Sequence, residues 1–161
     1  MGLALLIIDV QKEYMKEHLG TKVFEETLLY INATAKLFRQ ANLPVIKVKD
    51  ISEGDGPEYD FIDELDKHPN DIEIQKTKGN AFWKTNLDDL LKEKQVSYVV
   101  LSGTAAEHCV LATYNGAAER GYRPMMLQHG VFATHERGFL DLFWNRPLVS
   151  YTALTYMVKK A

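Results

Sequence analysis

The chain has 161 residues, 46% of them hydrophobic, and a net charge of −3 at pH 7, which is the composition of an ordinary globular protein long enough to bury a core. Lysines and acidic residues are interspersed, so no broad basic surface for nucleic acid is indicated, and the apolar run at residues 3–8 is too short for a signal peptide or a membrane span. A single cysteine excludes an internal disulfide and fits a reducing compartment. We therefore expect one cytoplasmic domain over residues 1–161, with no nucleic acid and no membrane as partner.

The first half of the chain alternates predicted strands and helices. A continuous apolar run at residues 3–10 is typical of a parallel strand buried on both faces, and Asp9 stands near its carboxyl end. Residues 11–20 form a polar loop that holds Tyr14, helical spacing predicts a helix over 25–41, and strands follow at 45–48 and 72–76. We interpret residues 50–70, rich in glycine, proline and acids, as a long surface loop and a possible lid.

The second half repeats this alternation. A loop at 77–83 carries two aromatics, a leucine-faced helix follows near residues 87–91, and the most apolar strand spans 96–101. A helix then runs to Arg120, and strands at 124–127 and 148–151 flank a short helix at 136–144 before a closing helix. These elements predict an α/β protein: a three-layer α/β/α sandwich around a Rossmann-like parallel sheet.

The only cysteine, Cys109, follows the most apolar strand at a strand-loop-helix junction. Backbone N–H groups in the first turn of a helix lack partners and carry the positive end of the dipole, so we expect a lowered thiol pKa there. That would make Cys109 a nucleophile. The alternative is that a lone cysteine acts as a small buried hydrophobe.

Three predicted strand ends carry Asp9, Lys76 and Cys109. The carboxyl ends of parallel strands meet at one edge of a sheet, so these residues can converge in one crevice. A carboxylate can take the thiol proton as general base, an ammonium favours the thiolate, and backbone N–H groups between Thr104 and Cys109 can hold an oxyanion. The set suits a cysteine hydrolase.

Three stretches carry a family resemblance: Leu-Ile-Ile-Asp-Val-Gln at 6–11, Lys76 followed by Gly-Asn-Ala-Phe at 79–82, and Ser-Gly-Thr-Ala-Ala-Glu-His-Cys-Val-Leu-Ala-Thr at 102–113. Together they resemble the isochorismatase-like cysteine hydrolases, which include nicotinamidases and N-carbamoylsarcosine amidases. The resemblance implies a six-stranded parallel sheet and a catalytic Asp9, Lys76 and Cys109. Lys76 is chosen over Lys78 because the family places its lysine six residues before the phenylalanine, here Phe82.

The resemblance also implies a non-proline cis peptide bond, which falls at Thr104–Ala105. In the family this turn points backbone N–H groups, here those of Ala105 and Cys109, toward the substrate oxygen. We therefore assign Thr104, Ala105 and Cys109 to the expected oxyanion hole.

The expected metal chemistry departs from that of nicotinamidases. Those relatives carry an Asp-x-His pair and a further histidine as metal ligands, whereas this chain has Lys-Asp-Ile-Ser at 49–52 and scattered histidines. We expect no metal and no other cofactor. Isochorismatases proper need no cysteine nucleophile, so Cys109 favours the amidase-like branch.

The substrate pocket is less specified. We assign Gln11, Tyr14, Phe82 and Trp83 to it, because small-molecule sites are mostly apolar and aromatic with a few polar anchors. Core packing or a subunit contact is the alternative for the aromatics, and Gln11 either orients Asp9 or begins the loop. His108 is expected to face away from Cys109, because adjacent helical residues point about 100° apart.

The predicted function is a metal-independent cysteine hydrolase that cleaves a small amide or related C–N bond through a thioester. A catalytically silent binding or scaffold protein with the same fold is the alternative. Thiol redox chemistry ranks last, because a lone cysteine has no internal resolving partner. We expect a small-molecule substrate and a homo-oligomer, a dimer or larger, with the C-terminal aromatics as one source of its interface.

Overall fold

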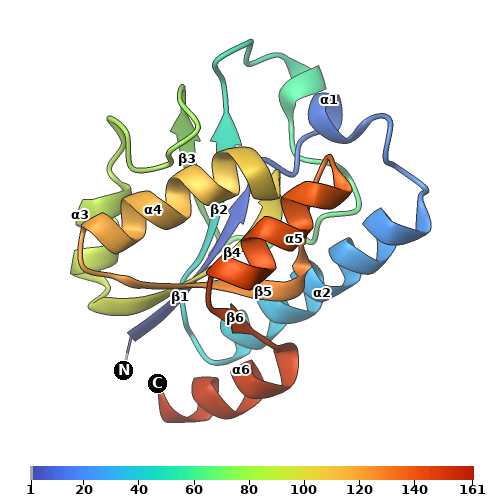
Figure 1. Ribbon diagram of the computed structural model, residues 1–161. Helices are drawn as coiled ribbons and strands as arrows, with labels where there is room; N and C mark the ends of the chain where they lie inside the picture. The colour runs from blue at the N-terminus through green and yellow to red at the C-terminus, as the bar shows by residue number, and fades with distance from the viewer. Residues whose placement is uncertain (1) are drawn as a thin grey trace.

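A single parallel sheet organises the molecule (Figure 1). The computed structural model describes residues 2–161, without the side chains of residues 136 and 141. The sheet has six strands in the order β3-β2-β1-β4-β5-β6, and every pairing is parallel. The strands are β1 (Gly2–Ile8), β2 (Val45–Asp50), β3 (Ile72–Lys76), β4 (Val96–Thr104), β5 (Arg123–Phe132) and β6 (Leu148–Val149). The predicted six-stranded parallel sheet is confirmed.

Strand β1 lies at the middle of the sheet and separates two cores. Successive residues of a strand point to opposite faces, so residues 3, 5 and 7 join one apolar cluster while residues 4, 6 and 8 join the other. All of them are fully buried, which explains why the run is continuously apolar. The first cluster packs against α2 (Lys22–Gln40) and α6 (Tyr151–Met157), and the second against α3 (Leu87–Glu93), α4 (Leu111–Glu119) and α5 (Glu136–Asn145), which completes the three layers (Figure 1).

Several predicted boundaries were wrong by a few residues. Helix α2 begins earlier than expected because Thr21 caps it, its Oγ1 accepting a hydrogen bond from the Phe24 N–H at 3.4 Å. Strands β4 and β5 are longer than predicted because Gly103 pairs with Val131 and Thr104 with Phe132 beyond the apolar stretches. Cross-strand hydrogen bonding, which a hydrophobic pattern does not report, sets these ends.

The predicted loops are partly ordered. Residues 11–20 contain the short helix α1 (Lys12–Met15), which buries Met15. Within residues 50–70 lies the single turn η1 (Pro57–Tyr59), and after it Ile62 and Leu65 enter the first core. The second half of this loop is therefore anchored, and Ser52 and Glu53 stay exposed near the carboxyl ends of the strands.

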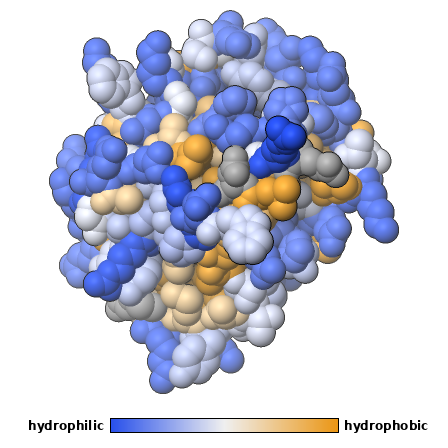
Figure 2. All heavy atoms as spheres, viewed as in Figure 1, coloured by the Kyte–Doolittle hydropathy of each residue, from blue (hydrophilic) through white to orange (hydrophobic). Residues whose placement is uncertain are grey.

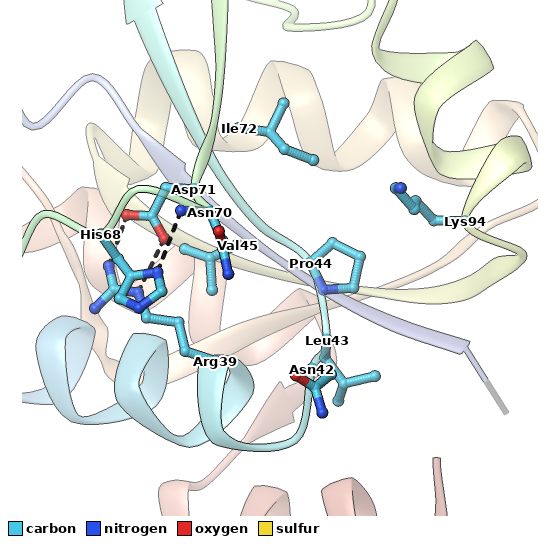
Figure 3. A pocket seen from close by; sticks show the side chains of 10 residues that line it. All are labelled: Arg39, Asn42, Leu43, Pro44, Val45, His68, Asn70, Asp71, Ile72 and Lys94. Carbon is cyan, nitrogen blue, oxygen red and sulfur yellow. Dashed lines mark hydrogen bonds and ion pairs between the residues drawn. The ribbon is translucent and has the colours of Figure 1, made fainter.

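The amino edge of the sheet holds a pocket of about 220 Å³ (Figure 3). Arg39, on the last turn of α2, donates to both carboxylate oxygens of Asp71, from Nε at 2.9 Å and from Nη2 at 2.8 Å. Asp71 immediately precedes β3, so this bidentate pair ties the helix to an edge strand (Figure 3). The pair is structural, and it lies at the opposite edge from the strand ends that carry Asp9 and Lys76.

The surface drawn in Figure 2 is largely hydrophilic, with apolar residues gathered near its middle, where α4 and α5 lie. On α5, Leu142 is buried, whereas Leu140 and Trp144 are 59% and 84% exposed. One side of α5 thus packs on the sheet while apolar side chains remain in solvent. The homo-oligomer stays a prediction. Among the described residues, no helix combines the length and the apolarity that crossing a bilayer requires.

Gly103 is required by the close approach of β4 to β1. Its φ is +99°, and a Cβ atom there would lie 2.1 Å from the Ile8 carbonyl oxygen. Gly121, just after α4, has a similar φ of +86° but open space around it. Both glycines therefore have a positive φ, but only at Gly103 would an added methyl group collide with a neighbouring strand.

This difference gives a stability prediction. Gly121→Ala should cost about 1–2 kcal/mol, the price of a left-handed backbone for alanine. Gly103→Ala should cost about 3 kcal/mol or more, because the added methyl group also collides with backbone. Urea denaturation of both variants measures the two losses. Equal losses would contradict the argument for close strand approach.

Candidate active site

Four polar side chains meet at the carboxyl edge of the sheet. Asp9 directly follows β1, Asp50 ends β2, Lys76 ends β3 and Cys109 lies in the turn after β4. The Lys76 Nζ atom lies 2.8 Å from Asp9 Oδ2, 2.5 Å from Asp50 Oδ2 and 3.4 Å from Cys109 Sγ. The strand order reverses between β1 and β4, which is where open α/β sheets place their ligands.

Asp9 reaches the site through an unusual backbone conformation. Its φ is +51°, and its N–H donates to the Val48 carbonyl at 3.0 Å, so the chain turns out of the sheet while still bound to β2. Asp9 Oδ2 contacts Lys76, and the buried Oδ1 has no hydrogen-bond partner. Burial raises the pKa of Asp9 to about 6, against the opposing charge of Lys76. This carboxylate can therefore accept a proton near neutral pH.

Asp50 is the member of this cluster that the sequence analysis missed. Its Oδ2 atom accepts from Lys76, and its Oδ1 accepts from the Ser52 N–H at 2.8 Å. Burial alone would raise the pKa of Asp50, but these hydrogen bonds hold it below its usual range. The sequence offered only the place of Asp50 two residues beyond the predicted strand end at 48, whereas its pairing with Lys76 follows from the register of β2 and β3.

Gln11 holds Asp50 in place. Its Oε1 accepts from the Asp50 N–H at 2.7 Å, and its Nε2 donates to the carbonyls of Asp50 and Tyr59 at 2.9 and 2.7 Å. Gln11 therefore orients the end of β2. Its assignment to the pocket was wrong, because it does not line the pocket around Cys109. Of its two alternative roles, orienting Asp9 does not hold, because its amide binds backbone groups of Asp50 and Tyr59.

Lys76 remains charged although its side chain is fully buried. Burial lowers the pKa of an ammonium group, but the charge of Asp9 and the hydrogen bond to Asp50 outweigh this and raise the pKa of Lys76 above its usual value. Two carboxylates thus share one ammonium.

The expected low pKa of Cys109 was wrong. Burial and the neighbouring Asp9 carboxylate raise the pKa of the thiol to about 12, although Lys76 opposes them. The turn is also not an ordinary helix start: it is the π-helical segment η2 (Ala106–Val110), in which the N–H groups of His108 and Val110 already donate to the Ala105 carbonyl. Cys109 is therefore a neutral thiol at rest.

The peptide bond between Thr104 and Ala105 is cis, as the resemblance implied. It lies directly between the end of β4 and η2. The oxyanion role of Thr104, Ala105 and Cys109 stays a prediction.

Comparison with known proteins agrees with this geometry. The model of the isochorismatase domain family matches residues 3–146. The chain belongs to this family. An N-carbamoylsarcosine amidase from Thermoplasma acidophilum superposes with a TM-score of 0.80 at 27% identity, over 89% of this chain and 91% of that one. A pyrazinamidase of Pyrococcus horikoshii, in a zinc complex, shares the fold with a TM-score of 0.80 at 19% identity, over 94% of this chain and all of the other.

Curated sequences give a second line of similarity. The ureidoacrylate amidohydrolase RutB of Variovorax paradoxus is 33% identical over 95 residues, which is 59% of this chain. The match spans only 36% of that enzyme, about a third of its length.

The donors at this isochorismatase-type site do not fit a metal ion. Ligand atoms of Asp9, Asp50 and Cys109 lie within 4.8 Å of one another. However, all three contact the Lys76 ammonium, and a divalent cation placed among them would be repelled by it. The acids here neutralise a lysine.

A pocket of about 330 Å³ opens above these residues. Tyr14 lies in its lining, together with Cys109, Asp9 and Asp50. His108 also lies in the lining, so the expectation that it faces away was wrong, because the wider π-helical turn changes the direction of neighbouring side chains. Four further residues line the pocket and were missed by the sequence analysis: Asp50, Ser52, Glu53 and Thr134.

The other two aromatic residues assigned to the pocket lie elsewhere. Phe82 is buried in the second core, where its ring stacks on Tyr122 with centroids 6.0 Å apart and lies beneath Arg120. Trp83 is 53% exposed and contacts Lys84 at the surface. The pocket assignment was therefore wrong for both, and for Phe82 the core-packing alternative holds.

The pKa of the thiol can be measured by alkylation, since the chain has one cysteine. The rate of Cys109 alkylation by iodoacetamide should keep rising above pH 9, because the thiol titrates near 12. Asp9→Asn should lower the apparent pKa by removing the carboxylate charge that disfavours the thiolate. The exposed Asp63→Asn removes the same charge outside the site and should change nothing. A parent profile that levels off below pH 8.5 would contradict this account.

Proposed function

We propose that the protein is a metal-independent cysteine amidohydrolase that cleaves a small amide or a related C–N bond. The observation that carries this proposal is the contact of one buried ammonium, Lys76, with both Asp9 and Cys109 at the floor of a pocket. The thiol supplies a nucleophile and the carboxylate a base.

The first half-reaction forms a thioester. Cys109 Sγ attacks the amide carbonyl while its proton passes to Asp9, whose Oδ1 is the oxygen without a hydrogen-bond partner. Asp9 then gives this proton to the departing nitrogen, the C–N bond breaks, and ammonia or an amine leaves. A group with a pKa of about 6 can both take and return a proton near neutral pH.

The second half-reaction releases the acid. Asp9 takes a proton from water, the hydroxide attacks the thioester carbonyl, and the C–S bond breaks as the proton returns to Cys109. Lys76 stays charged throughout and stabilises the thiolate, while its contact with Asp9 Oδ2 keeps Oδ1 free for the proton.

Relatives support the reaction class. The N-carbamoylsarcosine amidase and the ureidoacrylate amidohydrolase are both named for C–N hydrolysis, at 27% and 33% identity. Neither identity specifies the substrate of this chain.

A catalytically silent binding protein is the second candidate, and one observation favours it. The raised pKa of Cys109 leaves the thiol protonated at neutral pH, so the site needs a proton transfer before it can react. An inert pocket would keep the same fold and the same ion pairs.

Mutation of the nucleophile separates the two. Cys109→Ala should reduce ammonia release from a panel of small amides by about 10³-fold or more, because no thioester can form. Its melting temperature should stay close to that of the parent, which shows that the fold survives. Mass spectrometry of the parent during turnover should detect an acyl group on Cys109. Undiminished hydrolysis in Cys109→Ala would rule out the proposal.

The pH dependence tests the role of Asp9. With an uncharged amide as substrate, kcat/KM should fall about tenfold per pH unit below about 6, because protonated Asp9 cannot accept the thiol proton. It should be flat between pH 7 and pH 8, since the reactive form contains the neutral thiol. An acidic limb centred near pH 8.5 would instead mean that a pre-formed thiolate reacts.

A further inference from the structure

The charge that lines the pocket is one-sided. Asp9, Asp50 and Glu53 all belong to its lining, and the lining contains no arginine or lysine among the described residues. Glu53 stands exposed at the mouth, whereas Asp9 and Asp50 lie at the floor. A ligand that enters this pocket therefore meets a carboxylate at its mouth and two more at its floor.

Lys76 cannot offer an anion site to the ligand. An ammonium group has three N–H donors, and Lys76 Nζ lies within 3.4 Å of three acceptors, Asp9 Oδ2, Asp50 Oδ2 and Cys109 Sγ. Its side chain has no exposed surface. The two carboxylates outnumber its single charge, so this cluster adds no positive field to the pocket.

Glu53 is not neutralised by a neighbouring cation. No lysine or arginine in the described part of the chain forms an ion pair with it, and nearby Lys49 is held by Asp55 at 2.6 Å and Asp60 at 3.0 Å. Tyr14 senses the resulting field: burial raises its pKa to about 12, and the charges of Asp50, Glu53 and Asp9 add to the rise. The three carboxylates of the lining, with no lysine or arginine among its described residues, thus indicate a negative potential inside the pocket.

We infer that this pocket selects substrates whose remaining part is neutral or positively charged, that it rejects carboxylates, and that Glu53 is a specificity-determining residue. Selection among substrates rests on the proposed amidohydrolase function, whereas selection by charge applies to any ligand that enters the pocket. Like charges at contact distance oppose binding, and the carboxylate at the mouth and the two at the floor of the pocket all repel an anion.

Charged thiol reagents measure this selection without turnover. Trimethylammonioethyl and sulfonatoethyl methanethiosulfonate both form a disulfide with Cys109 and release methanesulfinate, and they differ mainly in charge. The rate of Cys109 modification by the cationic reagent is divided by the rate for the anionic reagent. This ratio is then divided by the same ratio for free mercaptoethanol, which corrects for the intrinsic reactivity of the reagents. The corrected ratio should be about tenfold or more at low salt. It should fall toward unity in high salt.

Variants identify the residue responsible. Glu53→Gln should reduce the ratio several-fold, and Glu53→Lys should reduce it about tenfold or more. Glu119→Lys makes the same change of net charge at an exposed position outside the lining and should leave the ratio unaltered. His108→Gln should preserve the preference, because it leaves the three carboxylates of the lining in place. A parent ratio near unity, or an equal effect of Glu119→Lys, would overturn the inference.

Hydrolysis of amides that differ in charge tests the same selection independently. Butyramide, β-alaninamide and succinamate have similar lengths and carry no charge, a positive charge and a negative charge. The kcat/KM for the first two should exceed that for succinamate about tenfold, and Glu53→Lys should narrow the difference. If none is hydrolysed, the amidohydrolase proposal is in doubt while the thiol ratio still decides the charge selection. If succinamate is the best substrate, the charge inference fails and the amidohydrolase proposal stands.

Discussion

The site depends on one buried ion cluster, in which the Lys76 ammonium is shared by Asp9 and Asp50. A charged side chain without exposed surface costs several kcal/mol of desolvation free energy, so it persists only where partners and hydrogen bonds offset that cost. Each partner sits at the end of a different strand, and β2 and β3 bring Asp50 and Lys76 into register. The parallel sheet is therefore what makes the charged cluster possible.

The same cluster sets the protonation states that chemistry requires. Burial and the Asp9 carboxylate outweigh the Lys76 ammonium, which is shared by two carboxylates, so the resting Cys109 thiol is neutral. Burial also raises the pKa of Asp9 toward neutrality. The neutral thiol and the nearby carboxylate, both at the floor of the pocket, form a pair that can exchange one proton when a carbonyl group arrives.

Asp50 binds a lysine in a segment where the sequence analysis looked for metal ligands. Where nicotinamidases are expected to carry metal ligands, this member of the isochorismatase family has an aspartate that binds a lysine instead. Gln11 uses both its amide oxygen and its amide nitrogen to fix that aspartate, so residues 11 and 50 act as one structural unit. The carboxylate that remains unbalanced, together with Glu53, gives the pocket its negative character.

The sequence by itself determined the parallel α/β class and the place of Asp9, Lys76 and Cys109 at one edge of the sheet. The physical reason is that buried parallel strands are continuously apolar and their carboxyl ends share one edge. Tertiary structure alone decided the partnership of Asp50 with Lys76, the burial of Phe82 away from the pocket and the entry of His108 into it. These depend on strand register, on side-chain direction and on a π-helical turn, none of which leaves a periodic signal in the chain. The thiol pKa belongs with them, because it reflects the balance between burial and surrounding charge in three dimensions.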